Sequence, residues 1–418
     1  MKKELFDERA RGYIFSAFYV CLLVLAATLS AKIGLSHYFA RKADQDQSFA
    51  RALFFDQKNP EAYVRRGDYA LAKQDFSSAV ENYLRAADLR KNDFVLWTRL
   101  GSALAKLGER DRAKAAYQNS LDLAPHFAQP NRLMGLLLLE KGRDEQAFEY
   151  LRKGAEADQA LYPELLQIAL RRYPSDISSI ERFADPRSTG QKKLLAAFMI
   201  NHDLMSIRLK TLLTGDLLSD TEKDLFVTQL LSKNKTRLAY EIWSTKSGVV
   251  NILPAAGEKV IDGSFEGPSA GNNTFGWRLG HKLEAVSVAV DSARHHSGSR
   301  ALNIQYKGDL DPGATLFSQL VAVEPNTNYR LSFAVLSTEL TSGALPVITV
   351  TGGHTPLAKS HMIEATGGKW FVKTIEFRSG KDDSVVIALQ RANCVASLCP
   401  IFGDLSLDDV SMVEAASR

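Results

Sequence analysis

The sequence predicts a multidomain protein of the α plus β class, with a transmembrane helix, an all-α solenoid and then an all-β sandwich. Three observations carry this prediction. An apolar run stands near the N-terminus, a motif recurs every 34 residues in the next region, and beyond residue 250 the hydrophobic period changes from 3.6 to 2. With 418 residues and 45% hydrophobic content, the chain is long enough for two or three domains with cores of their own.

The apolar run covers residues 13–31 without a charge, and only Lys32 interrupts it before Leu35. Because a bilayer core needs roughly 20 helical residues, residues 13–35 are predicted to be a transmembrane signal anchor that follows a cytoplasmic tail, 1–12. A cleaved signal peptide is the alternative. The run is longer than a typical signal core, and Leu29 stands where a small residue should precede the cleavage site. Basic residues flank the span in similar number on both sides, so the positive-inside rule does not decide its orientation.

The second region repeats itself in three copies, at 60–93, 94–127 and 128–161. Each copy has the pattern of two amphipathic helices joined by a short turn. The copies place small and large residues at the same positions: Gly67, Gly101 and Gly135, then Ala79, Ala113 and Ala147, then Tyr83, Tyr117 and Leu151. This pattern resembles the tetratricopeptide repeat. The second copy matches it best, through Trp97, Leu100, Gly101, Leu104, Gly108, Ala113, Tyr117 and Pro125.

The resemblance implies a short superhelix over 44–162, made of the three copies and one preceding helix, and then degenerate helical repeats or a cap at 163–247. Repeats of this family bind peptides or helices in a concave groove. The first helix of each copy is expected to line that groove, which gives the set Val64, Asp68, Leu71, Thr98, Ser102, Ala105, Arg132, Leu136 and Leu139. The alternative is that the chain's own later helices cover Leu136 and Leu139. Trp97 is interpreted as a core residue.

After a linker at 248–258, residues 259–415 alternate apolar and polar positions in about nine or ten short segments, as in an antiparallel sandwich. The segments VIDGSFEG, FGWRL, HHSGSRALNI, GKWFVKTIEFRSG and LSLDDVSM follow one another in the order of jelly-roll carbohydrate-binding modules of the family-four/nine type, which this region resembles. The resemblance implies a structural calcium held by Glu266 with Asp408 or Asp409. The alternative is that these acids are surface carboxylates and turn caps.

Sugar binding requires an exposed aromatic face for stacking, together with polar groups that bond to hydroxyls. By the same resemblance the aromatic candidates are Trp277, Trp370 and Phe371. The alternative is that Trp277 and Trp370 belong to the core of the sandwich.

Cys394 and Cys399 stand near the C-terminus with four residues between them. They lack the second pair of ligands that structural zinc requires, and they are not the CxxC of thiol redox proteins. We interpret them as a disulfide that closes a short loop and persists only in an oxidising compartment; the alternative is two free buried thiols. The disulfide predicts a single-pass protein of the bacterial inner membrane, with repeats and jelly roll on the periplasmic or extracytoplasmic side. The reverse topology is the alternative.

No nucleophile elbow, phosphate loop, HExxH pattern or pair of catalytic carboxylates is found, so the sequence predicts no enzyme and no essential cofactor, and calcium is a candidate structural ion only. The net charge of +4 is spread over helical faces, which argues against nucleic-acid binding. The predicted function is a membrane-anchored scaffold that binds a protein through its repeats and polysaccharide through its jelly roll, in exopolysaccharide assembly or export. The alternatives are a purely protein-binding scaffold and a diverged glycosidase or enzyme accessory subunit.

Overall fold

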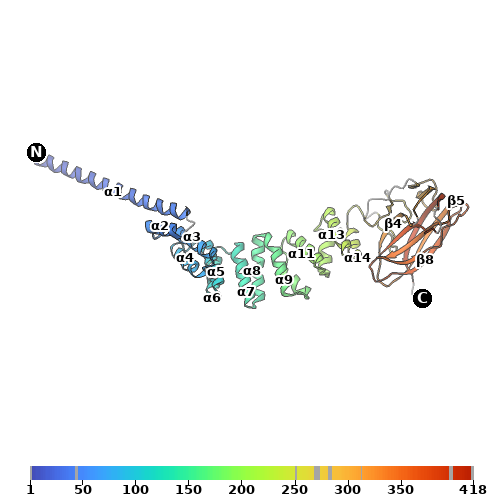
Figure 1. Cartoon of the computed structure of the whole chain (residues 1–418), viewed down its shortest axis with the longest axis horizontal. Coiled ribbons are helices and arrows are strands. Elements are labelled where there is room, and N and C mark those ends of the chain that lie inside the picture. Colours follow the sequence, from blue (N-terminus) through green and yellow to red (C-terminus); the bar gives the residue numbers. More distant parts are fainter. Residues whose placement is uncertain are drawn as a thin grey trace. The chain divides into compact units, whose positions relative to one another are not determined.

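The computed structural model describes residues 2–42, 46–249, 252–267, 274–280, 285–311, 313–394 and 399–415. It confirms the predicted class, because helices fill the N-terminal part and two antiparallel sheets fill the C-terminal part (Figure 1). The chain divides into two compact units, 1–195 and 196–418.

The first helix, α1, spans Lys2–Lys42 without a break. Its part from Ser16 to Lys42 has a mean hydropathy of 2.0, and its most apolar window is not buried by the rest of the chain. By length and composition this helix can cross a membrane.

The three predicted copies are three helix pairs of unit 1. The first helices are α3 (Pro60–Ala72), α5 (Phe94–Leu107) and α7 (Ala128–Glu140), and the second helices are α4 (Phe76–Leu89), α6 (Arg110–Leu123) and α8 (Asp144–Ala157). Asp93 caps α5 by accepting from the Leu96 N–H at 3.1 Å, and Gly108 ends it with a left-handed φ of 89°. Local signals thus set the ends of the repeat helices.

The repeated glycines have a packing role. At Gly67 an added Cβ would lie 2.7 Å from the Tyr83 ring, and at Gly101 it would lie 2.5 Å from the Tyr117 ring. Each glycine therefore lets the second helix of its copy bring a large buried ring against the backbone of the first. The 34-residue spacing of these glycines and tyrosines follows from this contact, which the first two copies share.

A further helix pair precedes the three copies. It consists of the end of α1 and α2 (Asp46–Phe55), whereas the sequence predicts a single preceding helix. Phe49 and Ala52 lie 34 residues before Tyr83 and Ala86, and both are buried. Ser36 of α1 is buried as well, and its Oγ donates to the Ala52 carbonyl at 2.7 Å. The last turns of the long apolar helix are therefore part of the repeat solenoid.

Shorter helices follow without a readable 34-residue period. They are a 3-10 turn at Gln159–Leu161 and then α9 (Tyr162–Arg172), α10 (Ile177–Ala184), α11 (Thr189–Asn201), α12 (Ile207–Thr214), α13 (Asp220–Ser232) and α14 (Thr236–Trp243). The ring of Phe183 in α10 stacks on Phe148 in α8 at 4.3 Å, so α10 continues the core of unit 1.

The sandwich of unit 2 has two five-stranded antiparallel sheets, in the orders β1-β4-β9-β6-β7 and β2-β3-β10-β5-β8. Alternate residues such as Phe333, Leu407 and Ile387 fill the space between them. The strands are β1 (Arg278–Leu279), β2 (Val286–Asp291), β3 (Ala301–Gly308), β4 (Thr315–Ala322), β5 (Asn328–Thr341), β6 (Pro346–Gly352), β7 (Thr355–Lys359), β8 (Phe371–Arg378), β9 (Ser384–Arg391) and β10 (Ile401–Glu414).

The last helix, α14, packs against the sandwich. The Asp383 carboxylate accepts from the backbone N–H groups of Thr236 and Arg237, at 3.2 and 2.9 Å, and so caps the helix. Phe275 lies 5.3 Å from the rings of both Tyr240 and Trp243. Helix and sandwich therefore form one compact unit, although the predicted linker at 248–258 separates them in the sequence.

Candidate binding surfaces

The apolar residues predicted for the repeat groove are only partly available. Val64, Leu71, Ala105 and Leu139 are half-buried and pack against the core of the solenoid. Leu136 is half-buried too, so the later helices leave part of it exposed. The predicted groove therefore offers shallow apolar patches.

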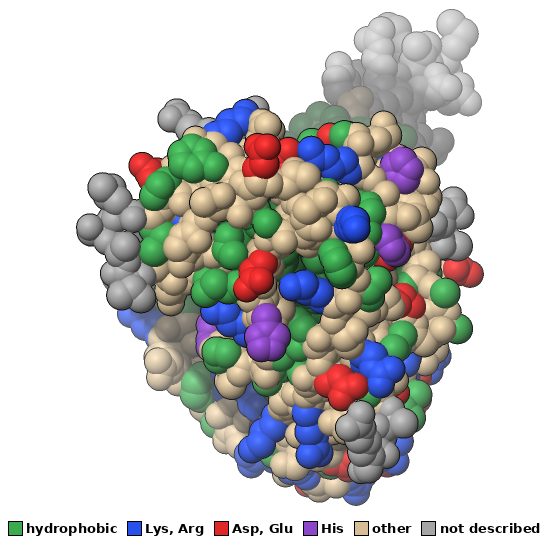
Figure 2. Space-filling view, turned by 90° about the vertical axis from the view of Figure 1, so that its right-hand side faces the viewer, with side chains coloured by type: hydrophobic (Ala, Val, Ile, Leu, Met, Phe, Trp, Pro, Cys, Tyr) green, Lys and Arg blue, Asp and Glu red, His purple; other side chains and the backbone are tan. Residues whose placement is uncertain are grey.

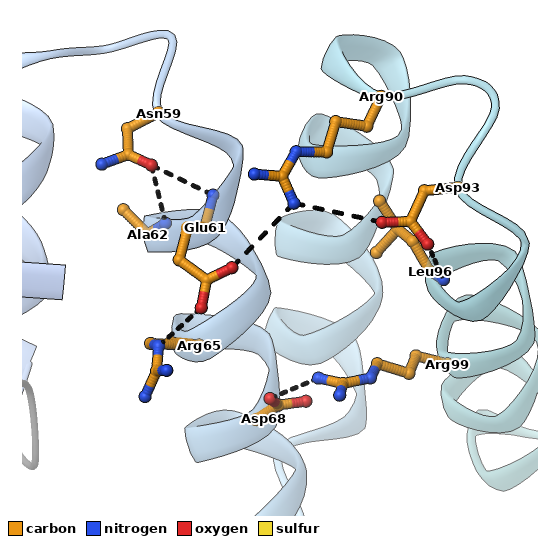
Figure 3. Close-up of polar contacts among 9 residues, drawn as sticks. All are labelled: Asn59, Glu61, Ala62, Arg65, Asp68, Arg90, Asp93, Leu96 and Arg99. Atoms are coloured by element: carbon orange, nitrogen blue, oxygen red, sulfur yellow. Dashed lines mark hydrogen bonds and ion pairs between the residues drawn. The ribbon is translucent and has the colours of Figure 1, made fainter. Parts of the chain in front are cut away.

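Asp68 and its partners form the main polar contact of this surface. The Asp68 carboxylate accepts from Arg99 Nη1 at 2.6 Å and from the Tyr83 hydroxyl at 2.7 Å, and Figure 3 shows the Asp68–Arg99 pair bridging two repeats. Burial raises the pKa of Tyr83, so its hydroxyl stays protonated and donates.

Further along, Arg132 makes a two-pronged ion pair with Glu164 of α9, with both N–O distances 2.6 Å. Its hydrogen bonds lower the pKa of Glu164. Thr98 is buried, and its hydroxyl bonds to the Ser120 hydroxyl at 2.8 Å. Ser102 stays half-buried at the surface.

Arg99 and Glu164 were missed by the sequence prediction. They stand 31 and 32 residues after Asp68 and Arg132, a little less than one repeat, so each pair joins neighbouring first helices. An opposite charge at that separation in a 34-residue repeat is the signal that could have found them. Because each predicted groove charge has a partner of opposite sign, the surface suits a ligand held by shape and polar contacts.

Weaker ion pairs connect the first two copies near the N-termini of their first helices, α3 and α5. Glu61 pairs with Arg65 at 2.8 Å and lies 4.0 Å from Arg90, which in turn lies 4.0 Å from Asp93 (Figure 3). These pairs are partly exposed, so they orient the helices more than they stabilise them.

In the sandwich, Trp277 is a core residue, and its assignment to a glycan site is wrong. Its side chain is 2% exposed, and its rings pack against Phe265 and Phe317 at 5.6 and 4.8 Å. The indole N–H donates to the Asp262 carbonyl at 2.9 Å. No sugar ring can reach a face that these neighbours cover.

Trp370 and Phe371 lie at the surface, at the start of the edge strand β8. Phe371 is 52% exposed, Val372 beside it is 63% exposed, and Trp370 is half-buried with its ring 5.4 Å from that of His296. We call Trp370, Phe371 and Val372 the edge platform. Phe371 pairs with Val335, a core residue of β5, whereas Val372 pairs with Ala334, so the exposed Phe371 ring and Val372 lie on opposite faces of the sheet.

Polar side chains lie in the same part of the sandwich as the edge platform. Arg294, two residues before His296, donates to Thr338 Oγ1 at 3.1 Å and to Asp404 Oδ2 at 2.9 Å across the outer face of the sheet. The Arg294 and Asp404 side chains are 37% and 30% exposed. This ion pair lies on the outer face of the sheet, the side opposite to the one that Phe371 shares with the core residue Val335.

The three predicted calcium ligands hold a loop. Glu266 Oε1 accepts from the backbone N–H groups of Ser299 and Arg300, at 2.6 and 2.8 Å. These bonds lower the pKa of Glu266. Asp408 Oδ2 accepts from the backbone N–H groups of His296 and Ser297, at 2.7 and 3.1 Å.

Asp409 completes this arrangement. Its Oδ2 lies 2.6 Å from His296 Nδ1, and its Oδ1 accepts from the Ser297 hydroxyl at 2.7 Å. Within the described ranges, no three acidic, His or Cys side chains gather closely enough to hold a metal. The carboxylate oxygens of Glu266, Asp408 and Asp409 therefore cap turns in this structure, which is the alternative interpretation. Calcium binding by these residues stays a prediction.

Cys394 and Cys399 are joined by a disulfide. It packs on a small apolar cluster of Ala344, Val347 and Ala392. Beside it lies Arg391, a buried cation that the sequence prediction missed. Its guanidinium donates to four neutral oxygens: the carbonyls of Leu310, Ala344 and Cys399, and the Ser342 hydroxyl. The disulfide loop therefore supplies one of the four acceptors of the Arg391 guanidinium. No local sequence pattern marks this arginine as buried.

A groove of about 830 Å³ opens between residues 252–267 and β10. Its carboxylates belong to Glu258, Asp262, Glu266 and Asp409, and burial raises the pKa of Asp262. On the face that Figure 2 turns to the viewer, hydrophobic, basic and acidic side chains are intermixed. Among the described side chains on this face, no large basic patch of the kind that nucleic acid requires is seen.

Comparison with known protein families supports both modules. The model of the tetratricopeptide repeat family matches residues 60–93 and 95–127, and that of a carbohydrate binding domain family matches residues 257–392. The chain therefore contains tetratricopeptide repeats, which are protein-interaction modules, and a domain like the carbohydrate-binding ones.

Characterised relatives match the repeats. The peroxisomal targeting signal receptor of Candida albicans is 30% identical over 26% of this chain and 19% of its own length. Small glutamine-rich tetratricopeptide repeat-containing protein 2 of Mycosarcoma maydis is 27% identical over 25% and 29%. Photosystem I assembly protein Ycf3 of Acaryochloris marina is 29% identical over 32% and 83%. The chain thus spans less than a third of the first two relatives.

Two solved structures are similar to parts of the chain. The match to a crystal structure of MamA covers 37% of this chain and 94% of the MamA chain, with 22% identity and a TM-score of 0.29. A structure titled "CBM4 structure and function" covers 37% and 98%, with 14% identity and a TM-score of 0.27.

Proposed function

We propose that this chain is a non-catalytic scaffold, anchored in the bacterial inner membrane, that binds a protein through its repeats and a polysaccharide through its jelly roll. The edge platform is the observation that carries the polysaccharide part. Phe371 exposes 52% of its surface at the edge of a domain that matches a carbohydrate binding family. Stacking of a sugar ring on such a face is favourable because it removes apolar area of both from water.

The repeats supply the second ligand. Their predicted groove has shallow apolar patches around Leu136 and paired charges at Asp68 and Arg132. These features suit an extended peptide or a helix with few charges of its own. The similarity to proteins named as targeting signal receptors supports a peptide ligand.

The disulfide and α1 support the proposed location. A disulfide between Cys394 and Cys399 persists in an oxidising compartment, and the apolar part of α1 is long enough to span a bilayer. Together they favour one crossing, with repeats and jelly roll on the periplasmic side. A polysaccharide-binding module tethered there fits a role in exopolysaccharide assembly or export.

The location is tested by thiol labelling in intact cells. Reduction followed by a membrane-impermeant maleimide should label wild-type protein strongly and a Cys394→Ser/Cys399→Ser variant weakly. Without reduction, both should give the same weak signal. Labelling of the wild type only after the inner membrane is opened would place the jelly roll in the cytoplasm and refute the topology.

The ligand class is tested by a glycan array probed with the full chain in detergent. Binding to one family of polysaccharides, absent from a matched membrane protein, supports the proposal. Absence of binding to every polysaccharide would favour the alternative of a purely protein-binding scaffold. The half-burial of Trp370 against His296 is the observation that favours this alternative, because it leaves only one fully available ring.

A further inference from the structure

At the junction of α1 and α2 there is a row of four aromatic rings. Tyr38 contacts Phe39 with ring centroids 5.5 Å apart, Phe39 stacks on Phe55 at 5.8 Å, and Phe55 contacts Phe54 at 5.5 Å. We call these four residues the aromatic row. The two inner rings are half-buried between the helices, whereas Tyr38 is 52% and Phe54 is 82% exposed.

The exposure of Phe54 is unusual for its helix. The other exposed positions of α2 that share its face are Gln47, Ala50 and Arg51, while Phe49 and Ala52 face the core. A large apolar ring on a polar face costs free energy in water unless something covers it. Within the described part of the chain, Phe54 keeps most of its surface open.

The place of this ring along α1 indicates what covers it. Since only residues 43–45 separate the two helices, α2 runs back along α1. The bond from Ser36 Oγ to the Ala52 carbonyl puts Ala52 level with Ser36, one residue beyond the apolar run that ends at Leu35. Phe54 follows Ala52 by two residues, about 3 Å farther back along the helix axis. Its backbone is therefore level with the end of the apolar run.

Basic residues outnumber acidic ones in the segment that holds the aromatic row. Between residues 32 and 58 the sequence has five basic residues, Lys32, Arg41, Lys42, Arg51 and Lys58, against the acidic residues Asp44, Asp46 and Asp56. Arg41, Lys42, Arg51 and Lys58 are exposed, and Lys42 Nζ lies 5.0 Å from the centre of the Tyr38 ring. Aromatic rings with basic side chains at the end of an apolar helix are typical of the interfacial layer of a bilayer.

We propose that the end of α2 is a second membrane contact, in which Phe54 and Tyr38 enter the interfacial layer of the bilayer that α1 crosses. The proposal rests on the membrane anchor proposed above. Because α2 belongs to the repeat solenoid through Phe49 and Ala52, this contact fixes the solenoid against the membrane surface. The groove of the repeats then lies at a fixed distance from the membrane surface, where it binds a partner that is itself at the membrane.

The test uses full-length protein reconstituted into vesicles of phosphatidylcholine and phosphatidylglycerol. Cys21, the free cysteine among the described residues, is first replaced by Ser, and single cysteines are introduced by Phe54→Cys, Ala50→Cys and Gln47→Cys. Each is labelled with an NBD fluorophore. Gln47 and Phe54 share the exposed face of α2, about 10 Å apart along its axis. Ile207→Cys, at an 87% exposed position in unit 2, is the distant control.

The label at position 54 should brighten several-fold on reconstitution and be quenched by lipids that carry a nitroxide near the headgroup. Quenching should fall from position 54 to 50 to 47 and be absent at 207. Adding Phe54→Asp to the Ala50→Cys variant should remove the quenching at position 50, which tests the wild-type ring itself.

Equal, weak quenching at positions 54 and 47 in vesicles that carry the protein would refute the interfacial contact and leave the anchor intact. Failure of the protein to float with the vesicles would refute the anchor itself. A bright label at position 54 that is insensitive to nitroxide lipids and depends on protein density would assign Phe54 to a second copy of the chain and overturn the proposal.

Discussion

Gly101 lies so close to Tyr117 that a Cβ atom at the glycine would be 2.5 Å from the ring. The first helix of the repeat and the ring of the second helix are therefore in direct contact. The predicted spacing of 34 residues reproduces the same arrangement at Gly67 and Tyr83. Because of this close packing, a larger residue in place of Gly101 would collide with the Tyr117 ring.

Gly101→Ala should therefore destabilise the solenoid. Overpacking costs about 1–3 kcal/mol, against a gain of up to about 1 kcal/mol in helix propensity. The net loss should appear in denaturant unfolding as a lower midpoint. Tyr117→Ala added to Gly101→Ala should show strong coupling, because it makes room for the methyl group. Additive effects of the two changes would contradict the contact.

The Arg132–Glu164 pair predicts a pH dependence. Hydrogen bonds from Arg132 depress the pKa of Glu164 in the folded state, so the pair stabilises the fold above the unfolded pKa of the glutamate. The stabilisation is lost as the pH falls through the depressed folded value. Both side chains are partly exposed, so the effect should stay under about 1 kcal/mol.

Comparison with Glu164→Gln measures this effect. The difference in unfolding free energy between wild type and variant should be largest at neutral pH and shrink in acid. Asp122→Asn, which neutralises an exposed carboxylate that accepts from Gln118 in the same helix, controls for general acid effects. A difference that stays constant down to the acid range would show that the ion pair contributes nothing.

Trp277 and Phe371 should respond to truncation to different extents. Trp277→Ala empties a buried site and should cost about 3–5 kcal/mol, whereas Phe371→Ser, at a half-exposed position, should cost about 1 kcal/mol. Thermal unfolding of both variants checks the ranking. Equal losses would mean that Phe371 is covered in the folded protein and cannot be a ligand platform.

The disulfide should stabilise the jelly roll modestly. Closing so short a loop contributes about 2 kcal/mol in the chain-entropy view, and the loop also supplies the Cys399 carbonyl to buried Arg391. Reductant should therefore lower the melting temperature of the wild type and leave that of Cys394→Ser/Cys399→Ser unchanged. A wild type that is insensitive to reductant would separate the disulfide from stability.

The sequence predicted what repetition and alternation encode. The three copies follow from the 34-residue spacing, because each repeat must bury the same face. The sandwich follows from the alternation of apolar and polar residues, because each strand buries one side. The helix pair of α1 and α2 was missed because its first helix is the apolar span, and Ile33 stands where the other copies have glycine. Its second helix still kept the period, through Phe49 and Ala52.

Individual side chains were harder to predict. Trp277 and Trp370 are the same residue type near strand starts, and only the folded chain shows that Phe265 and Phe317 cover one of them. Calcium binding by Glu266 and Asp408 stays a prediction, and the bonds that their oxygens accept come from backbone N–H groups of residues distant in sequence, which no local pattern shows. Arg391 has four neutral partners from three separate segments, a set that no local pattern encodes.

Affinity electrophoresis of the full chain in a gel that contains the polysaccharide identified on the array tests the central claim most directly. Phe371→Ser should weaken the retardation about tenfold in affinity, which corresponds to about 1.4 kcal/mol. Phe402→Ser, at a 50% exposed position on β10 outside the edge platform, should bind like the wild type. Equal retardation of all three proteins, or of none, would contradict polysaccharide binding by the edge platform.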